Sequence, residues 1–291
     1  MSRVLIVNAD DYGLTAAVSE GILRAHRDGV LTSTSLLVLA PGFSSSVGRL
    51  RDVAGLGIGA HLAAVGEDPP LLSAREIPTL VDARGYLPMS WRKLLPLVAA
   101  RRIDLDDIER EWTAQLEAID AEGLVVDHLD SHQHVHVFPG LRDVALRLAV
   151  RRRIGAVRVT RSASPGPVGR VASRLAGRFA ERAVAQCVAF PGDAAGLDEA
   201  GHLDEPTLLV ALERLARSNA AVVELSGHPG ARVDPDRHRY AWDYRWGDEL
   251  DALCAPAVRV AIERHGFRLG TYRDLASHAA APTASAPGAG V

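Results

Sequence analysis

Acidic and imidazole side chains gather at four places in this chain of 291 residues. Asp10 and Asp11 lie in the string NADDYG, and His61 lies in GAHL. Four histidines crowd into residues 128–136, in DHLDSHQHVH, and His228 follows much later in ELSGHPG. Two imidazoles and one carboxylate form a common ligand set of open catalytic metal sites, where a divalent metal acidifies water. The second carboxylate and the distant histidine suit a base and an acid, so the residue types predict metal-assisted hydrolysis.

Each motif alone also has a simpler interpretation. An acid pair after a strand can cap the next helix, and a single histidine at a strand end is usually a structural hydrogen-bonding group. The string DSHQHVH is more specific, because alternate residues of an extended segment point to one face. On this interpretation His132, His134 and His136 share a face. Asp130, His134 and His136 are then expected to support the metal ligands rather than to bind the metal.

The order of predicted elements brings these motifs together. The predicted strands cover residues 3–8, 30–39, 56–62, 124–129, 156–160 and 221–225, with a short one near Val188. The predicted helices cover residues 15–29, 43–53, 105–121, 141–152, 168–185, 205–217 and 248–265. This alternation predicts a parallel α/β sheet or barrel. In such folds catalytic groups lie beyond the carboxyl ends of the strands, which is where the four motifs fall.

The length suits one α/β barrel domain, predicted over residues 1–278. Within it, residues 63–104 carry several prolines and are predicted to be a loop-rich excursion that could cover the site. Residues 279–291, rich in Ala, Pro and Gly, are predicted to be a disordered tail.

Composition excludes several classes of function. The net charge of -3 argues against a nucleic-acid binder, and no GxGxxG or GxxxxGK[ST] motif supports a nucleotide site. No stretch approaches the roughly 20 apolar residues of a membrane span, and the start lacks the apolar core of a signal peptide. Two cysteines without CxxC spacing are read as reduced thiols, so a cytoplasmic location is expected.

Arginines and aromatic residues supply candidate substrate contacts. Arg158 and Arg161 follow the strand predicted at residues 156–160, although structural ion pairing is an equally good interpretation. Trp242, Tyr244 and Trp246 cluster after the HPG motif, where aromatic rings could stack on a sugar or anchor the loop. We take Arg158, Arg161 and Trp246 as the substrate-binding candidates.

A row of four arginines lies within the helix predicted at residues 168–185. Its members are spaced four apart, so they line one helix face: Arg170, Arg174, Arg178 and Arg182. Such a face could bind an anionic lipid or a phosphorylated substrate. The favoured interpretation is a solvated face in an arginine-rich protein.

Taken in order, NADDYG, GAHL, DSHQHVH and ELSGHPG resemble the landmarks of the YdjC-like carbohydrate deacetylases. This family includes chitooligosaccharide deacetylases and hopanoid-biosynthesis-associated deacetylases. The resemblance spans residues 3–275. It implies a distorted TIM-like (β/α) barrel of predominantly parallel strands, a divalent metal (Mg²⁺ or Zn²⁺) and a homodimer.

The family pattern also implies a role for each matching position. The metal ligands are Asp11, His61 and His132, the base is Asp10, and His228 is the acid or a substrate-polarising group. The chain departs from the pattern at Tyr12, where the family more often has Phe. It also departs in LAAV after His61, where a polar residue is often found, and this change touches the wall of the substrate pocket.

The expected activity is removal of the acetyl group from an N-acetylated amino sugar, either a chitooligosaccharide or a glycolipid-linked sugar. One alternative keeps the metal and changes the bond to another ester or to a phosphate ester. The absence of a second full ligand set argues against a two-metal phosphatase. A second alternative is a non-catalytic sugar-binding barrel, but ligation alone needs only one acid of the Asp10–Asp11 pair.

Overall fold

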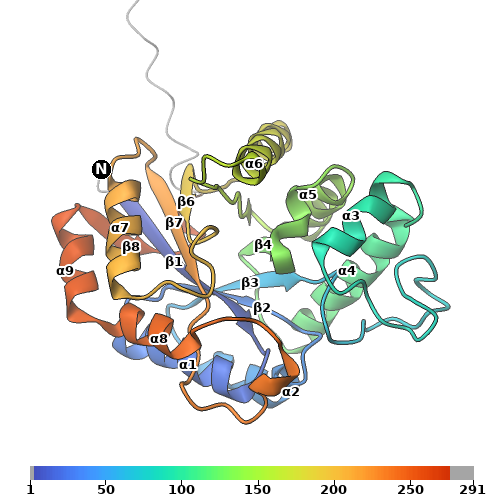
Figure 1. Ribbon diagram of the computed structural model, residues 1–291, viewed down its shortest axis with the longest axis horizontal. Helices are drawn as coiled ribbons and strands as arrows, with labels where there is room; N and C mark the ends of the chain where they lie inside the picture. Colours follow the sequence, from blue (N-terminus) through green and yellow to red (C-terminus); the bar gives the residue numbers. More distant parts are fainter. Residues whose placement is uncertain (1–2, 276–291) are drawn as a thin grey trace, which may run out of the picture.

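The structure, a computed structural model, describes residues 3–275. Within this range strands and helices alternate around a single sheet in which every strand pairing is parallel (Figure 1). The fold is thus a half-barrel of the α/β class, a distorted form of the TIM-like barrel, which confirms the predicted fold. The tail predicted at residues 279–291 lies outside the described residues.

One sheet of eight strands runs through the described residues. The strands are β1 (Arg3–Tyr12), β2 (Ser33–Leu36), β3 (Gly57–Leu62), β4 (His128–Ser131), β5 (Ala156–Val157), β6 (Asp193–Ala195), β7 (Val222–Gly227) and β8 (Phe267–Gly270). Their order is β5-β4-β3-β2-β1-β7-β6. β8 pairs with the first residues of β1, and β2 pairs with its last residues. β2 and β8 therefore share one edge of β1, and β7 pairs along the other edge. β1 therefore pairs with three other strands of the sheet.

Helices surround the sheet. They are α1 (Ala16–Asp28), α2 (Gly42–Ser46), α3 (Trp91–Ala99), α4 (Leu105–Ala121), α5 (Leu141–Arg152), α6 (Pro167–Ala185), α7 (Glu205–Ala216), α8 (Trp246–Cys254) and α9 (Pro256–Arg264), with 3-10 turns η1 (Val47–Asp52), η2 (His132–Val137) and η3 (Arg237–Arg239). Thr15 caps α1 as predicted, because its hydroxyl accepts a hydrogen bond of 3.0 Å from the Val18 amide. Figure 1 shows α1, α7, α8 and α9 at one end of the molecule and α3, α4 and α5 at the other. No helix of the described part is both long and apolar enough to cross a membrane.

The structure differs from the prediction at several elements. The single helix expected over residues 248–265 is two helices, because Pro256 biases Ala255 to an extended conformation and ends α8. The irregular segment expected at 63–104 contains α3, which Pro96 concealed although it lies inside the helix. The strand expected near Val188 is reduced to a single parallel bridge between Ala189 and Ala156, and β6 follows a few residues later. β8 was not predicted, because four residues are too few to show a period.

Candidate active site

The acid pair lies at the carboxyl end of β1. In a regular strand successive side chains point to opposite faces, which would separate Asp10 from Asp11. Asp11, however, has a left-handed backbone with φ of 67°, and the register of β1 against β2 shifts between Ala9 and Tyr12. This irregularity lets both carboxylates reach the same edge of the sheet, where each is only 1% exposed. Strained backbone of this kind is concentrated at functional sites.

The three predicted metal ligands, Asp11, His61 and His132, lie together. Asp11 Oδ1 is 3.4 Å from His61 Nε2 and 3.4 Å from His132 Nδ1. The three donor atoms all lie within 4.8 Å of one another, and all three residues are buried. Asp11 Oδ1 has no hydrogen-bond partner among the described residues, which is unusual for a buried carboxylate oxygen. A buried oxygen that makes no hydrogen bond to the described residues and lies 3.4 Å from two imidazole nitrogens fits a divalent cation in both donor type and spacing.

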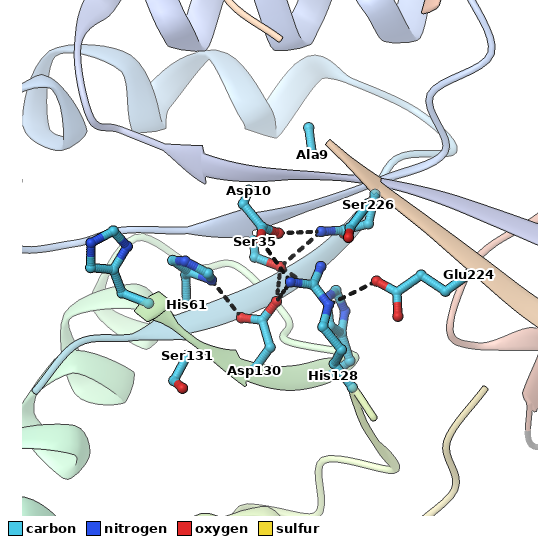
Figure 2. Close-up of polar contacts among 12 residues, drawn as sticks. Ala9, Asp10, Ser35, His61, His128, Asp130, Ser131, Glu224 and Ser226 are labelled. Atoms are coloured by element: carbon cyan, nitrogen blue, oxygen red, sulfur yellow. Dashed lines mark hydrogen bonds and ion pairs between the residues drawn. The ribbon is translucent and has the colours of Figure 1, made fainter. Parts of the chain in front are cut away.

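The orientation of His61 is set by Asp130 (Figure 2). The His61 Nδ1–H group donates to Asp130 Oδ1 at 2.8 Å, so Nε2 is the nitrogen that faces Asp11. Ser35 donates to the other Asp130 oxygen at 2.8 Å. Burial lowers the pKa of His61, but Asp130 and the nearby Asp10 outweigh burial and raise this pKa to about 9. Without a metal, His61 is therefore protonated at neutral pH, and its positive charge is stabilised by the surrounding carboxylates.

Arg158 is the centre of a buried network of ion pairs. Its Nη1 lies 2.7 Å from Asp10 Oδ2 and 2.8 Å from Asp130 Oδ2, and its Nε lies 2.8 Å from Glu224 Oε1. Arg158 is only 1% exposed, so structural pairing is the interpretation that the geometry supports rather than contact with substrate. Burial raises the pKa of Asp10, but the Arg158 charge outweighs burial and holds this pKa far below its usual range.

A second group of possible ligands overlaps the first. Asp10, His61 and Asp130 also bring three donor atoms within 4.8 Å. Here, however, both carboxylates already pair with the Arg158 guanidinium, which would repel a metal ion. The group containing Asp11 is therefore the better metal site.

The histidine-rich string folds differently from the prediction. Residues 132–137 form η2 rather than an extended segment, because Gln133 and His134 have left-handed backbones with φ of 52° and 53°. The prediction that three alternate histidines share one face is therefore wrong. His132 faces Asp11, whereas His136 accepts from Ser131 Oγ at 2.7 Å and donates to the Arg158 carbonyl at 3.0 Å. Burial lowers the pKa of His134 to about 3 and that of His136 to about 4.

His228 follows β7 and reaches the same site. Its Nε2 lies 3.8 Å from Asp10 Oδ2, although the two residues are far apart in the chain. The backbone amide of His228 donates to Glu249, which is fully buried in α8 and also accepts from the Leu203 amide at 3.2 Å. Burial raises the pKa of Glu249. Sequence reasoning missed Glu249. The signal that could have revealed it is an acidic residue on the buried face of α8, five residues before the helix ends at Cys254.

The remaining substrate-binding candidates, Arg161 and Trp246, differ in solvent exposure. Arg161 is partly exposed, with its Nε 3.9 Å from Asp193. Trp246 is 2% exposed and packs in the core. The partly exposed aromatic residues are instead Trp242, whose ring centroid lies 5.2 Å from that of His132, and Tyr244.

These features define a class: a parallel α/β half-barrel with a buried carboxylate–imidazole cluster at the carboxyl edge of its sheet. The family model described as YdjC-like protein matches residues 4–264. The chain belongs to the YdjC-like family, which confirms the resemblance inferred from its motifs.

Comparison with individual proteins agrees with this family membership. The chain is 28% identical over 284 residues to a carbohydrate deacetylase of Enterococcus faecalis, covering 94% of this chain and 99% of that protein. It is 31% identical over 276 residues to a chitooligosaccharide deacetylase of Salmonella paratyphi B, covering 94% and 100%. A carbohydrate deacetylase of Brevibacillus brevis is 39% identical over 150 residues, which cover 52% of this chain and 57% of that protein. A solved structure from Enterococcus faecalis V583, named for cellobiose-phosphate cleavage, superimposes with a TM-score of 0.80 at 29% identity, covering 94% and 99%.

Proposed function

We propose that this protein is a metal-dependent carbohydrate deacetylase that releases acetate from an N-acetylated amino sugar. The observation that carries the proposal is the cluster of Asp11, His61 and His132, with its unpaired Asp11 oxygen, beside Asp10 and His228. The names of the relatives support a carbohydrate substrate and deacetylation.

The metal would be held by Asp11 Oδ1, His61 Nε2 and His132 Nδ1. Two imidazoles in a set of three suit Zn²⁺ better than Mg²⁺, which prefers oxygen ligands. When bound, a metal of this kind polarises the amide carbonyl and lowers the pKa of water. Asp130 supports the centre by fixing which nitrogen of His61 faces it.

The protein's own groups would then move the protons. Asp10, kept ionised by Arg158, takes a proton from the attacking water as the water oxygen bonds to the acetyl carbon. His228, whose Nε2 lies 3.8 Å from Asp10 Oδ2, donates a proton to the nitrogen as the carbon–nitrogen bond breaks. The products are acetate and the free amino sugar, so protons and bonds balance.

Hydrolysis of a phosphate ester by two metals has less support. The described residues offer only one further ligand group, and it shares His61 with the first and pairs with Arg158. The cytoplasmic location and the homodimer expected from the sequence stay predictions.

Acetate release tests the proposal directly. Metal-stripped protein and protein reloaded with Zn²⁺ or Mg²⁺ are assayed on N-acetylglucosamine, acetylated chitooligosaccharides and acetylated glycolipids. We expect activity only after reloading, and none in His132→Ala, whose metal content should fall in parallel. Acetate release by the stripped protein, or none from any acetylated sugar by the reloaded protein, would contradict the proposal.

A further inference from the structure

The residues that connect η3 to α8 form an aromatic segment, residues 240–246. Residues 241–245 have no regular secondary structure, and the chain alternates between aromatic and small or charged side chains. The aromatic members are Tyr240, Trp242, Tyr244 and Trp246, and the alternate residues Ala241, Asp243 and Arg245 are exposed. Successive rings along the segment have centroids 5.3, 5.5 and 5.4 Å apart. The segment therefore presents one continuous aromatic side toward the protein.

That aromatic side lies over the candidate active site. The Trp242 ring stacks on His132 with centroids 5.2 Å apart, and the Tyr244 ring lies 4.8 Å from that of His228. His132 follows β4 and His228 follows β7, so two neighbouring rings of one segment contact both sides of the site. The segment thus forms part of the wall that a substrate meets.

Three of the four aromatic side chains are held by hydrogen bonds or by burial within the protein. The Tyr240 hydroxyl donates to Asp68 at 2.9 Å, and Trp242 Nε1 donates to Glu67 at 2.8 Å. Trp246 is buried in the core. Tyr244 differs, because it is partly exposed and its hydroxyl makes no hydrogen bond within residues 3–275. Trp246 Nε1 also makes no hydrogen bond in this range, but it is buried, so Tyr244 is the partly exposed ring of this segment with a hydrogen-bonding group left for a ligand.

The position of Tyr244 is fixed by contacts with Gly201. Gly201 lies against its ring, and a Cβ at Gly201 would lie 2.2 Å from Tyr244 Cδ1. The next residue, Arg245, donates its amide to the Gly201 carbonyl at 2.7 Å, which holds the segment in place. Burial, followed by the negative charges of Asp11 and Glu249, raises the pKa of Tyr244, so its hydroxyl stays a proton donor.

We propose that Tyr244 is a substrate-contacting residue whose hydroxyl donates a hydrogen bond to a sugar oxygen next to the N-acetyl group. The inference rests on the proposed function, in which His228 protonates the departing nitrogen. A residue in ring contact with His228 then lies on the sugar side of the bond that breaks, not on the acetyl side. Tyr244 thereby selects amino sugars over other acetylated amines, while Trp242 forms the adjacent wall.

The test removes one oxygen from the enzyme and one from the substrate. Tyr244→Phe should lower kcat/KM on N-acetylglucosamine substrates about tenfold, with metal content and Tm unchanged. The matched control is Tyr86→Phe, which removes the hydroxyl of an exposed tyrosine and should behave as wild type. The 1-deoxy and 3-deoxy analogues of N-acetylglucosamine each lack one neighbouring oxygen. On the analogue that lacks the partner oxygen, the tenfold difference between Tyr244→Phe and wild type should disappear.

A binding measurement gives a readout besides turnover. The affinity of the metal-loaded protein for glucosamine, measured by calorimetry, should fall in Tyr244→Phe and not in Tyr86→Phe. Equal kcat/KM for Tyr244→Phe and wild type, or a tenfold loss that persists on both deoxy analogues, would overturn the role of Tyr244 alone. Absence of acetate release by the wild-type protein would overturn the proposed function and this inference with it.

Discussion

Asp11 Oδ1 lies 3.4 Å from the nearest imidazole nitrogens, whereas Oδ2 of its chain neighbour Asp10 lies 2.7 Å from Arg158 Nη1. The two adjacent carboxylates thus have different partners. Asp11 Oδ1 makes no hydrogen bond among the described residues, whereas Asp10 pairs with the permanent positive charge of Arg158. The left-handed backbone of Asp11 allows this separation. Their functions should therefore be separable by substitution.

Asp11→Asn should abolish stoichiometric metal binding, because an amide oxygen is a much weaker ligand than a carboxylate. Asp10→Asn should keep the metal and lose at least about 100-fold in turnover, because an amide cannot accept the proton. Metal analysis of both purified variants, with acetate assays, checks the pair. The opposite pattern, with metal lost only in Asp10→Asn, would reverse the two assignments.

Arg158→Met should destabilise the protein by about 3 kcal/mol or more, because Asp10 and Glu224 would stay buried without the guanidinium that pairs with them, and Asp130 would keep only His61. Urea unfolding measures the loss. Arg161→Met is the control from the same loop, and as a partly exposed side chain it should change stability by no more than about 0.5 kcal/mol. A stable Arg158→Met protein with a raised KM would instead restore the interpretation of Arg158 as a substrate contact.

Metal binding at neutral pH should release about one proton, because His61 must lose its proton to become a ligand. Burial lowers and Asp130 raises the pKa of His61, to a net value of about 9, so the metal-free protein holds this proton at pH 7. Calorimetric titration in two buffers of different ionisation enthalpy counts the protons. Asp130→Asn should release fewer, and binding without proton release in the wild-type protein would show that His61 is already neutral.

Stability should fall as the pH drops below about 6.5. Burial lowers the pKa of His136 from 6.5 to about 4, so the unfolded chain binds a proton in this window while the folded protein does not. This group alone should make the free energy of unfolding about 2 kcal/mol smaller at pH 5 than at pH 7. His136→Gln should remove this share of the dependence and leave the share of His134, whose pKa burial also lowers, whereas His238→Gln, at an exposed position, should change neither. An unchanged slope in His136→Gln would contradict the assignment.

His228→Ala should reduce hydrolysis of an acetyl amide far more than hydrolysis of an acetyl ester of similar size. An amine needs a proton to leave, whereas an alcohol or phenol needs one less. Parallel rate measurements on the two substrates give the ratio. Equal losses on both would mean that His228 only shapes the loop held by Glu249, and that another group protonates the amine.

The chain order of local patterns was enough to predict the parallel α/β fold and the edge where the motifs meet. Each strand that carries Asp11 or His61 is a short apolar run, and the run and its terminal polar residue are both visible in the sequence. The local conformation of residues 132–137 was not visible, because left-handed residues at Gln133 and His134 break the period on which the prediction depended. Local periodicity reports which face a residue occupies only while the backbone stays regular.

Only the tertiary structure decided the partners of buried charges and the depth of aromatic rings. Arg158 meets Asp10 across 148 positions of the chain, and Trp246, not Tyr244, turned out to be the ring in the core. A charge or an aromatic ring has the same side chain whether it is buried or exposed. What distinguishes the two states is the set of groups that other strands and helices bring within a few ångströms, and that set is created by folding.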